Sequence, residues 1–366
     1  MRKAYKYRIY PTRKQAERLD HELASAQRLY NAALEQRRIA WKRQRTSLGY
    51  LDQASDLKDL RQTGTQTPAN YSACQDVLRR LDKAFQAFFR RLKAGAKPGF
   101  PRFKSRDRYD SLTFPSYGDG CRVRGNGKLY LQGVGEIRVK WHRQVKGKTK
   151  TVTVCRRGGR WHVCFSVEYE PRPLAEVDAE IGIDVGLEHF AALSNGELIP
   201  NPRWYKSAQR RLRRAQRKVA RRVKGSNGRR KAVRELQRVH ERVASQRADF
   251  VHKLSRRIVD GYQLIAVENL NVGGLSKGML AKQVHDAGWR SFLHKLIVKA
   301  AEAGRCVVEV NPAGTSQYCL CGCEVRKTLA VRVHRCPECG LVAPRDVVSA
   351  QLILRLGRSL ASANVA

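Results

Sequence analysis

Hydrophobic and polar positions in the first hundred residues change from a period of two to a helical period. Residues 2–10 alternate charged with aromatic or aliphatic side chains, which predicts a strand with one exposed face. A capping-box pair, Thr12 and Gln15, opens the first of three helical runs, and the last run ends near Gly95. That last run carries an apolar and aromatic stripe, which we interpret as core rather than as a surface for stacking bases. The stripe consists of Leu78, Leu81, Phe85, Phe88, Phe89 and Leu92.

From residue 97 the pattern is that of a small β domain. Its β-like stretches are separated by glycine turns at 125–127 and 158–159. We expect the strand at 2–10 to complete this domain, so that the helical runs form an insertion into it. A segment with acidic residues and two prolines, 168–180, predicts a linker to the second half of the chain.

The second half of the chain alternates strand patterns with helical ones. Apolar runs at 181–185, 264–270 and 306–310 predict buried strands, and helical patterns occupy 289–303 and 346–356. Strands that alternate with helices in this way predict an α/β layer.

A basic helical hairpin is predicted within this half, at residues 203–258, with its bend at 225–228. Between Lys206 and Arg247 there are 17 Lys or Arg residues against two acids, so few of these cations can have an acidic partner. A solvated charged face is the simpler interpretation, but the excess of cations favours an arm that follows phosphates. We assign nucleic-acid contacts on this arm to Arg210, Arg214 and Arg217.

The charge of the whole chain also favours binding to nucleic acid. It has 73 Lys and Arg residues against 32 Asp and Glu, a formal net charge of +41, and such a surface repels itself unless a polyanion neutralises it. We expect no membrane partner, because no run of about eighteen apolar residues occurs and residues 1–7 lack the apolar region of a signal peptide. The expected protein is soluble, cytoplasmic and bound to nucleic acid.

Three carboxylates stand at the ends of predicted elements. Asp184 and Glu268 close two strand runs, and Asp346 opens the last helical pattern. Asp184 alone fits an ordinary turn aspartate equally well, but a mixed sheet covered by that helix would bring all three acids to one edge. Crowded acids repel unless divalent cations lie among them, and carboxylate oxygens suit Mg²⁺. Two such ions could drive phosphodiester hydrolysis, and Asn269 and Asp286 are weaker candidates for supporting the site.

Five of the ten cysteines crowd between Cys319 and Cys339, which indicates one metal site rather than a disulfide framework. The sequence Cys336-Pro337-Glu338-Cys339-Gly340 is typical of a zinc knuckle, whereas the preceding three thiols contain no pair with the usual spacing. We predict one structural Zn²⁺ ion, because four thiolates leave no open position for catalysis. A glycine follows Cys321 as one follows Cys339, which favours Cys321 as the fourth ligand. The predicted ligands are Cys319, Cys321, Cys336 and Cys339, with Cys323 as the alternative to Cys321.

Seven short motifs follow one another along the chain. They are Gly99-Phe100-Pro101-Arg102-Phe103-Lys104, Gly182-Ile183-Asp184-Val185-Gly186, Val267-Glu268-Asn269-Leu270, Asp286-Ala287-Gly288-Trp289, Thr315-Ser316-Gln317-x-Cys319, Cys336-x-x-Cys339-Gly340 and Arg345-Asp346. In their order and approximate spacing they resemble the TnpB proteins of insertion sequences, which are relatives of the type V CRISPR effectors. The resemblance spans nearly the whole chain, and in the first motif we assign nucleic-acid contacts to Arg102 and Lys104.

The resemblance implies an α/β fold with additional α and β parts. An RNase H-like (RuvC) nuclease domain would occupy 171–310 and 346–366, and a zinc-ribbon insertion at 311–345 would bind the target nucleic acid. A wedge-like β-barrel would be formed by 1–10 and 97–170, with a helical recognition lobe, 11–96, inserted into it.

The resemblance also implies an RNA-guided DNA endonuclease in which Asp184, Glu268 and Asp346 match the catalytic positions. RNA from the transposon end would carry the guide, and a short motif beside the double-stranded DNA target would license strand opening. We expect a monomer in the prokaryotic cytoplasm that associates with the nucleoid when bound. The residues near positions that contact the adjacent motif in the family are Tyr50, Tyr71, Gln75 and Ser116.

Two departures from the family pattern leave an alternative open. The family usually has Asp-Arg-Asp before a downstream Asn, whereas here Pro344-Arg345-Asp346 is followed by Val347-Val348-Ser349. The first cysteine pair is also one residue short. The alternative function is therefore an RNA-guided DNA-binding repressor with weak or no cleavage. A DNA-strand transferase would share the acids, but the family resemblance assigns transposition to a separate protein.

Overall fold

The computed structural model describes residues 1–64, 67–328 and 330–363 and divides into two compact units, Met1–Glu170 and Pro171–Ala366. Each unit buries its own hydrophobic core. None of the helices in the described ranges combines the length and the apolarity that a membrane span requires.

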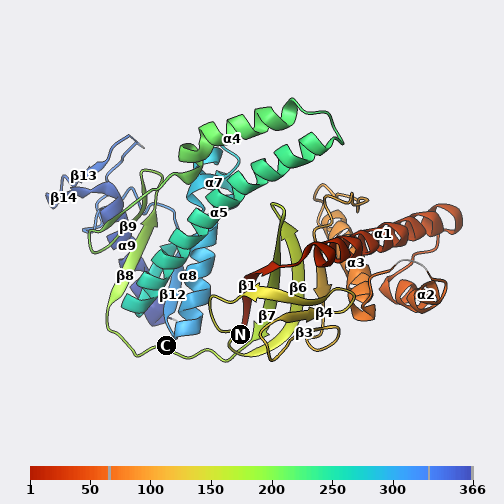
Figure 1. The fold of residues 1–366 in the computed structure, drawn as a ribbon. Coiled ribbons are helices and arrows are strands. Elements are labelled where there is room, and N and C mark those ends of the chain that lie inside the picture. The colour runs from red at the N-terminus through yellow and green to blue at the C-terminus, as the bar shows by residue number, and fades with distance from the viewer. Residues whose placement is uncertain (65–66, 329, 364–366) are drawn as a thin grey trace. The chain divides into compact units, whose positions relative to one another are not determined.

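The first unit contains a seven-stranded antiparallel sheet with the strand order β2-β6-β7-β1-β5-β4-β3 (Figure 1). The predicted strand at 2–10 is confirmed as β1, which pairs with β7 on one side and β5 on the other and so completes the sheet. The strands are β1 (Arg2–Tyr10), β2 (Ser111–Phe114), β3 (Cys121–Val123), β4 (Leu129–Leu131), β5 (Gly135–Lys140), β6 (Lys148–Arg157) and β7 (Arg160–Glu168).

The helices α1 (Arg13–Gln44), α2 (Tyr50–Gln62) and α3 (Tyr71–Lys93) come between β1 and β2 in the chain. The predicted capping box is confirmed at the start of α1. The backbone N–H of Gln15 donates to the Thr12 hydroxyl at 3.3 Å, and the Thr12 N–H donates to the Gln15 side chain at 3.0 Å. The helices share one core with the sheet, which includes Leu34, Leu81 and Phe165.

The aromatic stripe of α3 is only partly core, which corrects the prediction. Leu78 and Leu81 are buried, whereas Phe89 and Leu92 are each 56% exposed. The reason lies in the neighbouring helix. Beside the last turns of α3, the end of α1 presents residues such as Arg38 and Trp41, and the two helices line a groove there instead of packing against each other.

The second unit is built on a five-stranded mixed sheet with the order β10-β9-β8-β11-β12. The strands β8, β11 and β12 are parallel, while β9 and β10 are antiparallel additions on the β8 side. This arrangement confirms the predicted α/β layer. The strands are β8 (Glu180–Val185), β9 (His189–Leu193), β10 (Leu198–Pro200), β11 (Leu264–Glu268) and β12 (Cys306–Val310).

Helices cover both faces of this sheet. Ile183 and Ile265 belong to the core shared with α5 and α8, whereas Gly182 and Ala266, one residue along each strand, meet α9. The helices α4 and α5 form the predicted basic hairpin (Figure 1). The helices are α4 (Trp204–Ala220), α5 (Asn227–Gly261), α6 (Val272–Leu275), α7 (Ala281–Ala287), α8 (Trp289–Ala303) and α9 (Arg345–Ala363), and a short pair of strands, β13 (Val333–Arg335) and β14 (Val342–Pro344), precedes α9.

Candidate active site and cysteine cluster

Two of the three predicted acids lie on neighbouring parallel strands. The last pair in the register of β8 and β11 joins Ile183 to Val267, so that Asp184 and Glu268 are the next residues on the two strands. Both carboxylates are therefore held by strand backbone at the same end of the sheet.

The third acid is brought to this end by α9, which approaches the sheet at two glycines. A Cβ on Gly182 would lie 2.0 Å from the carbonyl oxygen of Ala350, and one on Gly357 would lie 2.5 Å from the Cβ of Ala266. The helix can pack this closely only because both positions lack a side chain. A Cβ on Gly186, two residues after Asp184, would lie 3.9 Å from a carboxylate oxygen of Asp346.

The three acids influence one another electrostatically. Burial raises the pKa of Asp184 well above its ordinary value, and the charges of Glu268 and Asp346 raise it further, while the Arg345 guanidinium lowers it. Burial also raises the pKa of Glu268, and the hydrogen bond from Thr315 opposes that shift. The end of the sheet thus concentrates negative charge that a cation would stabilise.

The carboxylates do not converge on a single point. Within the described ranges, the cysteine cluster is the one group of three or more metal-binding side chains whose ligand atoms all lie within 4.8 Å of one another. Two ions about 3.5 to 4 Å apart need acids that are spread around them, so the wider spacing is compatible with a two-ion site.

Asp286, a weaker candidate from the sequence, holds helices in place. Its carboxylate accepts hydrogen bonds from the backbone N–H groups of Tyr205 at 2.8 Å and Lys206 at 3.3 Å, in the first turn of α4. It also pairs with Arg247 of α5 at 3.0 Å, and Arg247 donates to the Asp286 carbonyl oxygen at 2.8 Å. Asp286 therefore joins α7 to the start of the hairpin.

We expect Asp286→Ala to destabilise the protein by about 1–3 kcal/mol, because it leaves one N–H group of the Arg247 guanidinium and two backbone N–H groups of α4 without their carboxylate acceptor. Urea unfolding followed by tryptophan fluorescence measures this change. The matched control is Asp249→Ala, which removes an exposed carboxylate of α5 that pairs with Lys253. An equal effect of both variants would contradict the role assigned to Asp286.

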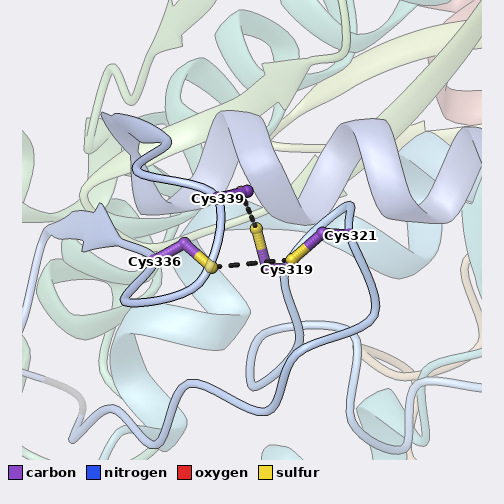
Figure 2. A group of neighbouring side chains, drawn as sticks. All are labelled: Cys319, Cys321, Cys336 and Cys339. Atoms are coloured by element: carbon purple, nitrogen blue, oxygen red, sulfur yellow. Dashed lines mark hydrogen bonds between the residues drawn. The ribbon is translucent and has the colours of Figure 1, made fainter.

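The structure brings four cysteines together (Figure 2). The Sγ atoms of Cys319 and Cys339 are 3.6 Å apart, as are those of Cys321 and Cys336. Cys323 stands outside this group, and its thiol contacts the carbonyl oxygen of Glu324 instead. The geometry thus selects Cys321 over Cys323 as the fourth member.

The loops around the cluster are shaped to hold thiolates. Gly322 and Gly340 both adopt positive φ angles, 93° and 70°, which let each loop turn tightly after a cysteine. Hydrogen bonds from the backbone N–H groups of Cys339 and Glu338 lower the pKa of Cys336 to about 6. Four such sulfurs could hold a zinc ion, which takes four thiolates in structural sites.

The predicted basic residues of the hairpin lie on its surface. Arg210, Arg214 and Arg217 are exposed, while Leu212 and Ala215 form the buried seam of α4. A shallow pocket of about 410 Å³ lies on this arm, and all of its lining residues within the described ranges are basic. They are Arg214, Arg217, Lys218, Arg221 and Arg222.

The candidate contact residues of the first unit occupy helix starts and loops. Tyr50 and Tyr71 are the first residues of α2 and α3, and Gln75 lies one turn after Tyr71. Arg79 and Arg61 lie over the two tyrosine rings, at 5.0 and 5.7 Å from their centroids.

The other three candidates lie in the loops that flank β2. Ser116 and Arg102 are exposed. The backbone of Lys104 is fastened to α1 because its N–H donates to the Asn31 side chain at 2.8 Å and its carbonyl oxygen accepts from Gln27 at 2.6 Å. The loop that carries Arg102 and Lys104 is therefore held against the helix.

The groove between α1 and α3 combines aromatic and basic side chains. It has a volume of about 780 Å³, and Trp41 and Phe89 in its walls are more than half exposed. Its charged lining contains four cations and one acid, namely Arg37, Arg38, Lys42, Arg43 and Glu35. Exposed ring faces among cations are typical of surfaces that bind single-stranded nucleic acid.

Sequence models of three protein families match the chain. A model described as "Probable transposase" matches residues 162–279, a model of the Cas12f1-like TNB domain matches 289–353, and a helix-turn-helix model matches 1–46. The last of these regions forms the strand β1 and the single long helix α1 here. The chain therefore belongs to the class of transposon-associated proteins that carry a TNB domain.

Two relatives identify the family. A protein of Streptomyces pristinaespiralis named "Putative RNA-guided DNA endonuclease" is 36% identical over 98% of this chain and 90% of its own length. The protein "Putative RNA-guided DNA endonuclease InsQ" of Escherichia coli (strain K12) is 31% identical over 78% of this chain and 74% of its own length. The chain belongs to the TnpB family, as the sequence motifs indicated.

A solved structure shares the fold. The chain in a cryo-EM structure of CasPhi-2 (Cas12j) bound to crRNA matches with a TM-score of 0.51 over 98% of each chain, at 10% sequence identity. At this identity the likeness concerns the fold alone.

Proposed function

We propose that this protein is an RNA-guided DNA endonuclease of an insertion sequence, which cleaves guide-complementary DNA beside a short adjacent motif. The observation that carries this proposal is the gathering of Asp184, Glu268 and Asp346 at one end of a mixed sheet, where their charges oppose one another. Membership of a family whose relatives are named RNA-guided DNA endonucleases supports RNA and DNA as the partners.

The three acids fit a pair of Mg²⁺ ions, because all their donor atoms are carboxylate oxygens and their mutual repulsion favours bound cations. When bound, two such ions supply the positive charge that activates a water and stabilises the leaving oxygen of a phosphodiester. The chain fixes where the acids stand. Asp184 and Glu268 are held by neighbouring strands, and Asp346 lies in the first turn of α9, where a helix favours negative charge.

The remaining assignments follow the TnpB resemblance. We assign 171–310 and 346–366 to a RuvC-like domain of the RNase H fold, and 311–345 to a zinc ribbon with one structural Zn²⁺ on the four grouped cysteines. A wedge-like barrel of 1–10 and 97–170, with a recognition lobe of 11–96, completes the proposed organisation. The protein acts as a monomer in the prokaryotic cytoplasm, at the nucleoid when bound to its target.

Two surfaces support binding of nucleic acid. The hairpin offers cations with few acidic partners, which suits phosphates, and the groove between α1 and α3 offers ring faces on which unpaired bases can stack. Each surface lies within one unit, so each can be tested by itself.

We expect Phe89→Ala to weaken binding of single-stranded RNA by about 5- to 100-fold, because stacking on one aromatic side chain contributes about 1–3 kcal/mol per base. Filter binding with a labelled oligouridylate at about 0.5 M NaCl measures this loss, since high salt suppresses the phosphate contacts of the rest of the surface. The control is Leu51→Ala, which removes an exposed apolar side chain of the same unit. Equal affinities for both variants would rule out a stacking role for Phe89.

The proposed function is tested with protein purified together with its co-expressed RNA. Sequencing that RNA is expected to show a constant scaffold followed by a variable end, and DNA complementary to the variable end is expected to be cut in Mg²⁺. Random RNA, or cutting that ignores the variable end, would contradict guidance.

The repressor alternative has one observation in its favour. Val347 and Val348, the two residues after Asp346, are buried in α9, and neither has a polar side chain that could support the site. A complex with Mg²⁺ that binds the complementary target and never nicks it would favour this alternative.

A further inference from the structure

A buried hydrogen bond joins Glu268 to a residue to which neither the sequence motifs nor the proposed function assigns a role. The Thr315 hydroxyl donates to a carboxylate oxygen of Glu268 at 2.5 Å, and it also lies 3.1 Å from the carbonyl oxygen of Pro312. A hydroxyl has a single proton, and the shorter contact to a charged acceptor takes it. Thr315 is 4% exposed and Glu268 is 9% exposed, so little water competes for this bond.

Thr315 is itself held firmly. Two residues later, the side chain of Gln317 donates to the carbonyl oxygen of Lys327 at 3.0 Å and accepts from the Lys327 N–H at 2.8 Å. The backbone carbonyl oxygen of Gln317 accepts from the N–H of Val325 at 2.7 Å. These hydrogen bonds fasten the segment that carries Thr315 to residues 325–327, which follow the first three cysteines.

Glu268 needs such a partner more than the other two acids do. A glutamate has one more rotatable bond than an aspartate, so a fixed strand backbone leaves its carboxylate freer to move. The Thr315 hydroxyl is the hydrogen-bond donor to the Glu268 side chain among the described contacts. Its bond selects one position of the carboxylate at the end of β11.

We infer that Thr315 is a positioning residue, whose hydroxyl holds the Glu268 carboxylate where it binds a divalent cation. This inference rests on the proposed function. Partners of this kind, which orient a metal ligand, typically change metal affinity or activity 10- to 100-fold when removed. In this interpretation the Thr-Ser-Gln motif orients one of the three acids, in addition to leading into the cysteine cluster.

The test compares Thr315→Val, which keeps the shape and removes the donor, with Thr315→Ser, which keeps the donor. Both are made in the full chain with its co-purified RNA. Binding of Mn²⁺, a paramagnetic probe for the carboxylate site, is followed by electron paramagnetic resonance, and single-turnover cleavage is measured against Mg²⁺ concentration.

We expect Thr315→Val to weaken Mn²⁺ binding and raise the Mg²⁺ requirement by about 10- to 100-fold, with target binding and zinc content unchanged. Thr315→Ser is expected to stay within about threefold of the wild type in both assays, since it keeps the hydrogen bond. A valine variant that loses only thermal stability, and binds Mn²⁺ as the wild type does, would overturn the inference. If the wild type does not cleave at all, the proposed function fails, while the Mn²⁺ measurement still decides the role of Thr315.

Discussion

Asp184→Asn is expected to slow target cleavage by about a thousandfold or more while target binding stays intact. The substitution keeps the shape of the side chain and removes one of the three charges that would hold the cations. Metal ions supply several kcal/mol of transition-state stabilisation in such reactions, and each 1.4 kcal/mol changes a rate tenfold. The measurement is single-turnover cleavage of a labelled duplex by the protein–RNA complex in Mg²⁺, with a gel-shift assay for binding.

The same variant is expected to lose cleavage activity but to keep or gain thermal stability. Burial and the charges of Glu268 and Asp346 raise the pKa of Asp184, so the wild type carries electrostatic repulsion that asparagine removes. The thermal midpoint in Mg²⁺-free buffer should therefore be equal to or higher than that of the wild type, a trade of stability for function. Asp249→Asn, at an exposed site on α5, should change neither property.

These outcomes separate a catalytic acid from a structural one. An Asp184→Asn variant that unfolds readily and loses target binding would show that the carboxylate supports the fold. An Asp184→Asn variant that cleaves at the wild-type rate would show that Asp184 is not a catalytic residue.

Much of the second unit could be predicted because its parallel strands are short and apolar, and because β8 and β11 carry a carboxylate at or beside their last residue. The ends of β8 and β11 follow directly from the sequence, and the parallel register then places Asp184 beside Glu268. The approach of α9 to the sheet could not be predicted in this way. It depends on Gly182 facing the backbone of Ala350, a contact between residues far apart in the chain.

Hydrophobic periodicity in a sequence indicates which face of a helix or strand is apolar, but it does not indicate which other element packs against that face. The stripe of α3 has a regular helical pattern, yet its buried residues end at Leu81 and Phe89 is exposed. Hydrogen bonds between residues far apart in the sequence cannot be predicted from periodicity either. The motif that contains Thr315 was recognised, but its bond to Glu268 spans 47 residues.

Gly182→Ala is expected to reduce cleavage by about a hundredfold through its effect on α9. The new Cβ would lie 2.0 Å from the Ala350 carbonyl oxygen and 2.8 Å from the Leu354 backbone nitrogen, and neither backbone atom can move without the helix. A shift of α9 carries Asp346 away from the other two acids, and a misplacement of about 1 Å at a reacting centre can slow a reaction about 10²-fold. Overpacking of this kind also destabilises by about 1–3 kcal/mol. Cleavage rate and urea unfolding measure the two effects.

The control for Gly182→Ala is Gly261→Ala at the end of α5, where a Cβ would meet no heavy atom within 4 Å. This second variant adds the same methyl group to the same unit, so it should cleave and unfold as the wild type does. A Gly182→Ala protein that matches the control in both assays would mean that α9 does not rest on β8 as closely as the structure has it. Asp346 would then need another anchor. Full stability with lost cleavage, in contrast, would show that a small movement of α9 is enough to separate Asp346 from Asp184 and Glu268.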